Sequence, residues 1–157
     1  MKNTPRFREY ANSTTYAIDA REKDYLYIGE SRIPGSGNGL FTAIPIYKDE
    51  VISIFKGKIL SNKEAQRRAT NGEDVYFMNM PDGTILDSRE VNCFAKYAND
   101  AAGSVKTRYR NNADITLDEK GAVCIVASRK ILAGEEIYCA YGPNYWQRHG
   151  AGGDSTE

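Results

Sequence analysis

The sequence predicts a mostly β fold with short helices, in which the strands form several small sheets. Short apolar runs alternate with turn signals along most of the chain, which is typical of many short strands. Two turns have a clear mechanism. In Pro81-Asp82-Gly83, proline presets φ and glycine supplies a positive φ, and Asp118-Glu119-Lys120-Gly121 closes a hairpin between β-branched runs.

We expect nine strands and two short helices. Ser61 and Glu64 have the spacing of a capping box, the residues that follow propagate a helix well, and Asn71-Gly72 ends it. Residues 93–97 are the candidate second helix. The expected strands cover residues 24–29, 39–43, 51–54, 58–60, 75–78, 84–87, 113–118, 122–127 and 136–139.

The length of 157 residues suits one domain that builds a hydrophobic core without disulfide or metal staples. We place this domain at residues 23–147, after an N-terminal extension at 1–22 and before a flexible polar tail at 148–157. Residues 40–52 also resemble residues 125–137, since each segment predicts a strand, a polar corner and a second strand. A single pair is too few for a solenoid and indicates a β fold with two similar corners.

Composition limits the partners that we expect. Lys+Arg and Asp+Glu both count 21, and this balance disfavours a strong grip on bare nucleic acid. The 3 cysteines lack metal-site spacing and His149 is the only histidine, so we expect no metal and a reducing, intracellular compartment, nuclear or cytoplasmic. We expect no membrane association, because the first residues hold no apolar signal segment and no run of about 18 apolar residues occurs.

Three segments have the composition of functional motifs. The first, residues 31–41, places glycines at alternate positions, which lets backbone groups approach a ligand without an intervening Cβ. A dinucleotide-binding loop does not fit, because Leu40 stands where its third glycine belongs and Ile44-Pro45-Ile46 breaks the required helix. No Gly-Lys-Ser/Thr follows, which excludes a P-loop, and a plain hairpin loop remains the alternative for this motif taken alone.

The second and third motifs are ambiguous when each is taken alone. Asn99-Asp100 and Asn111-Asn112 are typical of turns and side-chain caps, since Asx side chains bond local backbone. The third motif, residues 134–146, contains Tyr141-Gly142 and predicts a core strand followed by a turn. Its tyrosines are also consistent with simple packing in which each hydroxyl is hydrogen-bonded.

Taken in order, the three motifs resemble the SET-domain family, a β-clip fold. Gly37-Asn38-Gly39 is similar to its Gly-x-Gly motif, Asn99-Asp100 with Asn112 to its Asn-His…Pro-Asn motif, and residues 136–142 to its closing Glu-Leu-x-x-Asp-Tyr-Gly motif. The resemblance spans about residues 24–146. The chain departs from the pattern at three positions, where Asp100 replaces His, Asn111 replaces Pro and Ala140 replaces Asp.

The resemblance implies an S-adenosylmethionine-dependent protein lysine methyltransferase that needs no metal. Its substrate would be a protein or peptide bearing a lysine, with a histone tail as one candidate. Tyr141 would be the catalytic residue, at the point where cofactor and lysine meet. The implied cofactor-binding residues are Ser36, Gly37, Asn38, Gly39, Asn99, Asp100 and Trp146, and the implied substrate-channel residues are Tyr76, Tyr138 and Cys139.

Two other functions stay open. One is a catalytically inactive SET-like module that binds a protein or peptide without turnover, which the three departures favour. The other is a small nucleic-acid-binding module that uses Lys106, Arg108 and Arg110. Such a group of charges is more often a solvated loop face.

Overall fold

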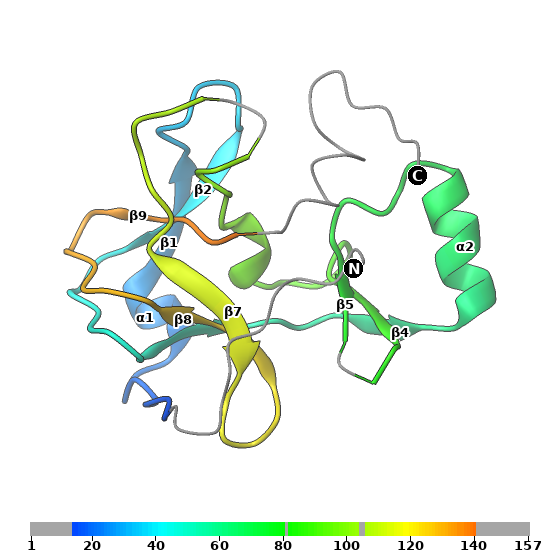
Figure 1. Cartoon of the computed structure of the whole chain (residues 1–157), viewed down its shortest axis with the longest axis horizontal. Coiled ribbons are helices and arrows are strands. Elements are labelled where there is room, and N and C mark those ends of the chain that lie inside the picture. The colour runs from blue at the N-terminus through cyan, green and yellow to red at the C-terminus, as the bar shows by residue number, and fades with distance from the viewer. Residues whose placement is uncertain (1–13, 81, 104–105, 141–157) are drawn as a thin grey trace.

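The computed structural model describes residues 14–80, 82–103 and 106–140 (Figure 1). Within these ranges the chain forms nine short strands, two α-helices and one 3-10 turn. In chain order the elements are α1 (Glu22–Tyr25), β1 (Leu26–Glu30), β2 (Asn38–Thr42), β3 (Val51–Ile54), β4 (Lys58–Leu60), α2 (Asn62–Thr70), β5 (Phe77–Asn79), β6 (Ile85–Asp87), η1 (Ala95–Tyr97), β7 (Ala113–Leu117), β8 (Val123–Ala127) and β9 (Glu136–Ile137).

The strands pair into three antiparallel sheets of three strands each, in the orders β1-β2-β9, β3-β8-β7 and β4-β6-β5. The first two sheets lie together on the left of Figure 1, whereas the third sheet and α2 form a separate group on the right. The prediction of a mostly β chain with several small sheets and short helices is therefore confirmed.

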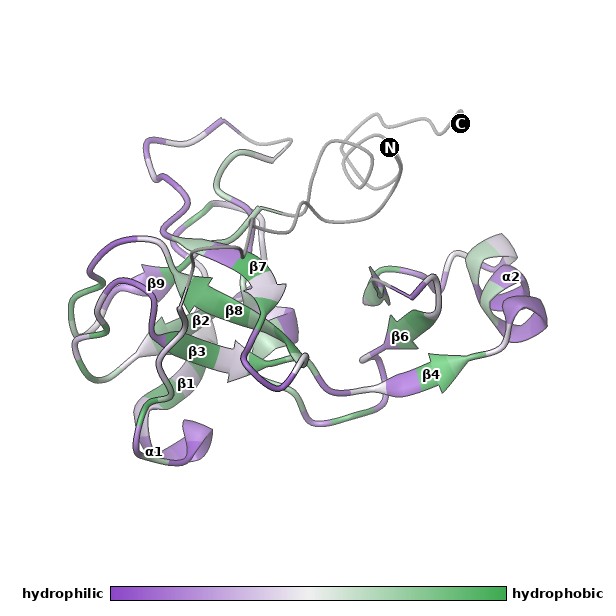
Figure 2. Cartoon of the chain, turned by 60° about the horizontal axis from the view of Figure 1, so that its bottom comes forward, coloured by the Kyte–Doolittle hydropathy of each residue, from purple (hydrophilic) through white to green (hydrophobic). Residues whose placement is uncertain are grey.

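The core lies between the first two sheets. All five residues of β8 are buried, which is why this strand is a continuous apolar run and does not alternate with polar residues (Figure 2). Ile46 and Ile131, on the two corners, are also fully buried and belong to the same cluster.

The two predicted corners meet each other in the structure. Ile46 and Ile131 exchange backbone hydrogen bonds, N–H to carbonyl oxygen, at 2.8 Å in both directions. Each of these isoleucines is the middle residue of its corner, so the two corners contact each other at equivalent positions. Next to this contact β2 pairs with β9, in the sheet that carries the first and third motifs.

The backbone of the corners is equivalent residue by residue. Asp49 has φ 73° and Gly134, at the corresponding position, has φ 87°. Glu50 and Glu135 follow them, and each carboxylate accepts the backbone N–H three residues earlier at 2.8 Å. The internal resemblance of residues 40–52 and 125–137 thus corresponds to two copies of one turn.

Two predicted strands begin two residues too early, and the strand predicted at residues 136–139 ends at residue 137. Residues 24–25 belong to the helical turn α1, because Glu22 accepts hydrogen bonds from Ser53 Oγ at 2.6 Å and Ile54 N at 2.9 Å and so fixes this turn against β3. Residues 75–76 lie in a turn before β5, where the N–H of Phe77 donates to the carbonyl of Asp74 at 3.2 Å.

Part of the expected N-terminal extension contacts the domain. The N–H of Tyr16 donates to the carbonyl of Asp49 at 2.9 Å, and the N–H of Val51 donates to the carbonyl of Tyr16 at 2.8 Å. Residues 1–13 and the expected tail at 148–157 lie outside the described residues. No helix in the described ranges combines the length and apolar character that crossing a membrane requires.

The predicted helix is α2, and its start and end are as expected. Ser61 is the N-cap and its hydroxyl accepts the N–H of Glu64 at 3.1 Å, while Asn71 is the C-cap. The Glu64 carboxylate contacts two arginines of the helix, Arg67 at 2.6 Å and Arg68 at 2.7 Å. These contacts, first with Arg67 and then with Arg68, lower the pKa of Glu64 to about 2.

This lowered pKa predicts an acid-dependent contribution of Glu64 to stability. Because the folded-state pKa lies below the ordinary value of 4.5, the contribution is complete above about pH 5 and is lost as the pH falls toward 2. The Tm difference between the protein and Glu64→Gln should be constant from pH 5 to 7 and shrink below pH 4.5. A difference independent of pH would contradict the assigned contacts.

Candidate functional site

Glu136 is the centre of the candidate site, although its side chain is only 2% exposed. Its carboxylate accepts the Ser31 hydroxyl at 2.7 Å, the Arg32 N–H at 2.7 Å, the Tyr138 hydroxyl at 2.9 Å and the Asn99 side-chain amide at 3.4 Å. We call these five residues the Glu136 cluster. Because a buried carboxylate requires such donors, the cluster fixes three chain segments relative to one another.

The Glu136 carboxylate also explains why residue 39 is glycine. A Cβ on Gly39 would lie 2.3 Å from Glu136 Oε2 and 2.9 Å from Cδ, closer than any tolerated contact. Gly35 and Gly37 are required for a different reason, since they have φ of 77° and 66°. The shape of the loop therefore depends on the left-handed backbone of Gly35 and Gly37 and on the close approach of Gly39 to the Glu136 carboxylate.

Asn99 connects the first motif, residues 31–41, which we call the glycine loop, to the second motif. Its side-chain Nδ2 donates to the carbonyl of Asn38 at 3.0 Å, and its own carbonyl accepts the N–H of Cys139 at 2.9 Å. Gly37-Asn38-Gly39, Asn99 and Glu136 are thus brought together. Ser36 lies in the same loop, where its N–H donates to the carbonyl of Ile33 at 3.1 Å.

Asp100 and Asn111, two of the departures from the family pattern, contact each other. Asn111 Nδ2 donates to Asp100 Oδ1 at 3.0 Å, and Asn111 Oδ1 accepts the N–H of Ala101 at 2.8 Å. Asp100 Oδ1 also accepts the N–H of Ala102 at 2.8 Å. The two residues form a local pair that holds both ends of the intervening loop.

Asn112 holds the segment that follows β9. Its Nδ2 donates to the carbonyl of Glu136 at 3.0 Å and its Oδ1 accepts the N–H of Tyr138 at 2.9 Å. Asn112 is itself 2% exposed. The backbone of residues 136–139 is therefore fixed by side-chain and backbone contacts from two directions.

Tyr138 and Cys139 lie on opposite sides of the chain, since neighbours in an extended segment alternate. The Tyr138 ring packs with Ile33 and Ala101, and burial followed by the contact with Glu136 raises the pKa of its hydroxyl. Cys139 is fully buried in the main core, and burial raises the pKa of its thiol. The two side chains belong to different clusters, and their channel roles stay predictions.

Tyr76 contacts a lysine of the chain itself. Lys96 Nζ lies 5.3 Å from the Tyr76 ring centre and 5.5 Å from that of Tyr97. The same ammonium donates to the carbonyls of Ser88 at 2.9 Å and Val91 at 3.0 Å. This contact joins the β4-β6-β5 group to the turn η1 that leads to Asn99.

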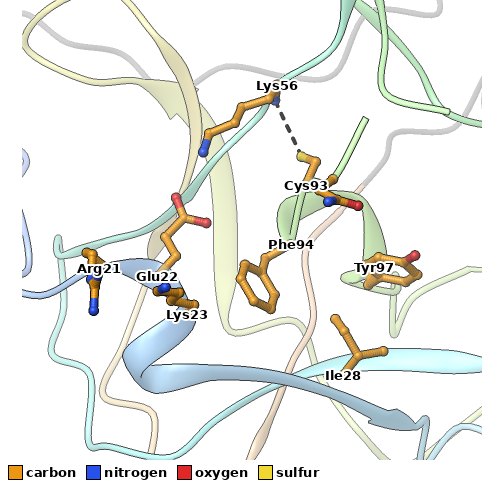
Figure 3. A pocket seen from close by; sticks show the side chains of 9 residues that line it. Arg21, Glu22, Lys23, Ile28, Lys56, Cys93, Phe94 and Tyr97 are labelled. Atoms are coloured by element: carbon orange, nitrogen blue, oxygen red, sulfur yellow. Dashed lines mark hydrogen bonds between the residues drawn. The ribbon is translucent and has the colours of Figure 1, made fainter. Parts of the chain in front are cut away.

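A pocket lies apart from the Glu136 cluster. It has a volume of about 770 Å³ and lies between α1, β1 and η1, with Phe94, Tyr97 and Ile28 on one side and Glu22 and Lys56 near its other end (Figure 3). None of the predicted site residues that the structure describes lines it. Within the described part of the chain there is also no group of three or more His, Cys, Asp or Glu side chains that could hold a metal ion.

Two predicted site residues, Tyr141 and Trp146, lie outside the described residues. The sequence interpretation in turn missed the roles of Ser31, Lys96 and Glu136. The available signal for Glu136 was its position: an acidic residue on the same face as Tyr138, at the start of a strand expected to be core. An ionised residue there predicts a buried, hydrogen-bonded carboxylate.

Comparison with known proteins is consistent with this arrangement. The family model described as SET domain matches residues 37–142. Histone-lysine N-methyltransferase mes-2 of Caenorhabditis elegans is 37% identical over 76 residues, which are 46% of this chain and 10% of that protein. Histone-lysine N-methyltransferase 2D of Homo sapiens is 25% identical over 146 residues, 88% of this chain and 2% of that protein. Histone-lysine N-methyltransferase EZ1 of Zea mays is 27% identical over 124 residues, 77% of this chain and 13% of that protein. The chain thus spans only 2% to 13% of the length of these relatives.

Proposed function

This chain belongs to the SET-domain family, and we propose that it transfers a methyl group from S-adenosylmethionine to the ε-amine of a lysine in a protein substrate. The observation that carries the proposal is the convergence of the three motifs on Glu136, with the glycine loop held against Asn99. The relatives compared above are named histone-lysine N-methyltransferases, so a histone is our first candidate substrate.

The glycine loop fits the proposed cofactor. An added Cβ on Gly35 or Gly37 would meet no described atom within 4 Å, so the backbone on this side of the loop is open to a ligand. We assign the methionine end to backbone groups of residues 36–38 and the adenosine side to Asn99 and Asp100, with Trp146 covering the site. When bound, S-adenosylmethionine supplies the methyl group, activated by its sulfonium.

The protein must deprotonate, orient and shield the lysine. An amine with an ordinary pKa of about 10.4 is protonated at neutral pH, and a desolvated channel beside a cation disfavours the charged form. We assign the channel wall to Tyr76 and the orienting hydroxyl to Tyr141. Tyr141 follows the segment whose backbone Asn99 and Asn112 hold. Alignment of the amine and exclusion of water then provide most of the rate enhancement.

The direct test is transfer of a labelled methyl group from S-adenosylmethionine to purified histones and to a cell lysate. We expect transfer by the unaltered protein and a fall in kcat of about a hundredfold in Tyr141→Phe, with cofactor binding retained. Tyr47→Phe is the matched control, because Tyr47 is 53% exposed at a corner, and it should leave kcat unchanged. Full activity in Tyr141→Phe would contradict the assigned role.

The same experiment decides the competing function, a catalytically inactive SET-like module that binds a protein or peptide. Asp100, Asn111 and Ala140 are the residues that favour it. The contact between Asp100 and Asn111 supports the enzyme, because the two changed residues form an ordered pair. Cofactor binding without transfer to any substrate would support the binding module, and absence of cofactor binding would overturn the proposed enzyme function.

A further inference from the structure

Residues 106–110 present three exposed cations within five residues. Lys106, Arg108 and Arg110 are exposed, whereas Thr107 and Tyr109 between them are half-buried. The backbone bends at Arg108, so the three cations lie around a bend of the chain. We call the three cations the basic ridge.

The basic ridge is anchored through Tyr109. The Tyr109 ring stacks on Tyr138 with centres 5.6 Å apart and an angle of 26° between the planes. The Tyr138 hydroxyl in turn donates to Glu136 at 2.9 Å. The Arg108 guanidinium lies 5.1 Å from the Tyr109 ring centre and donates to its hydroxyl at 3.2 Å. Contacts therefore connect the exposed Arg108, through Tyr109 and Tyr138, to the buried carboxylate of Glu136.

A second anchor lies at the end of the same loop. Asn111 follows the basic ridge directly and is held by Asp100 and Ala101. Ile33 of the glycine loop packs into the same cluster as Ala101 and Tyr109, which is why the loop lies beside residues 31–37 in Figure 1. The three charges are therefore presented on supported backbone, which reduces the conformational entropy that a partner must overcome.

The charges of the basic ridge face outward without a compensating acid. Among the described residues no ion pair involves Lys106, Arg108 or Arg110. The two carboxylates beneath the loop, Asp100 and Glu136, are buried and hydrogen-bonded to their own partners. The surface is consequently complementary to a ligand with several negative charges.

We propose that the basic ridge docks an acidic segment of a partner protein. Several carboxylates on one segment complement three cations that form no ion pair with another described residue. Single-stranded nucleic acid fits less well, because its bases need free aromatic faces and the Tyr109 ring is already engaged by Tyr138 and Arg108. A basic tail, such as that of a DNA-binding protein, would be repelled, so this surface is separate from one that receives such a tail as substrate.

The test is fluorescence anisotropy with two labelled peptides that differ only in carrying glutamate or glutamine at three alternate positions. At low salt we expect about tenfold tighter binding of the glutamate peptide, from three exposed charge pairs. Lys106→Gln/Arg108→Gln/Arg110→Gln should abolish this preference. The matched control, Lys58→Gln/Lys63→Gln/Lys120→Gln, removes the same charge from exposed positions elsewhere and should keep it.

A second variant covers the case in which loss of Arg108 disturbs the loop. Lys106→Glu/Arg110→Glu spares the Arg108–Tyr109 contact and should favour the glutamine peptide. Equal binding of both peptides by the unaltered protein, or a preference that survives both variants, overturns the proposal. Tighter binding of an oligo-dT than of the glutamate peptide, lost with the basic ridge, assigns the surface to nucleic acid instead. Methyl transfer is not needed, so failure of the proposed enzyme function leaves this test intact.

Discussion

Gly39→Ala is expected to lower the free energy of unfolding by about 4 kcal/mol and to abolish cofactor binding. The added methyl group would lie 2.3 Å from Glu136 Oε2, and the carboxylate cannot retreat without losing contacts to Ser31, Arg32 and Tyr138. Buried donors left without partners add to the steric cost. Urea unfolding measures the stability, and calorimetric titration with S-adenosylmethionine measures binding.

Gly29→Ala provides the control for this prediction. Gly29 is the register partner of Gly39 on β1, and its added Cβ would meet only the Phe41 ring at 3.4 Å, an ordinary contact. We expect a change within about 1 kcal/mol. In Gly39→Ala/Glu136→Ala the clash is absent, so the double variant should cost less than the sum of the two single changes. Equal stability of Gly39→Ala and Gly29→Ala would contradict the close approach.

Most elements of this fold could be predicted because their signals are local. Ser61 marks the start of α2 through a hydrogen bond that spans three residues, and Gly83 and Gly121 adopt the positive φ that the two turns require. The two corners could be recognised as similar because the spacing from strand to acidic residue is the same in both. The wrong boundary at residues 24–25 has the opposite cause, since α1 is held by contacts with β3 that sequence periodicity does not encode.

The site was predicted only in part, because its central contacts join residues far apart in the chain. Glu136 meets Ser31 across 105 positions, and nothing near either residue indicates the other. The pairing of Asp100 with Asn111 was likewise hidden, since the sequence indicated only local turns and caps and two departures from a family pattern. Ser31, Glu136 and Asp100 are buried, and an unpaired polar group at a buried position is costly, so a partner must exist.

Arg68→Met is expected to lower the free energy of unfolding by about 3 to 5 kcal/mol. Arg68 Nη1 lies 2.7 Å from Asp87 Oδ2, with side-chain exposures of 10% and 0%. Removing the arginine leaves a buried carboxylate whose only other described contact is the N–H of Arg89. Arg67→Met is the control, because Arg67 is 57% exposed and its ion-pair partner Glu64 is 30% exposed, so a much smaller loss of stability is expected.

Loss of the Arg68–Asp87 pair should also affect the candidate site, because the pair joins α2 to the sheet that positions Tyr76. Asp87 pairs with Phe77 in register, and Tyr76 precedes Phe77 and contacts Lys96 within η1. Arg68→Met/Asp87→Leu removes both charges together and should recover most of the lost stability, since no carboxylate is left buried and unpaired. If hydrogen exchange of β5 and β6 rises in Arg68→Met and returns to its original rate in the double variant, the buried unpaired carboxylate is what loosens this group. Fast exchange in both variants would instead assign the arginine a packing role, because then its aliphatic stem and not its charge would fix α2.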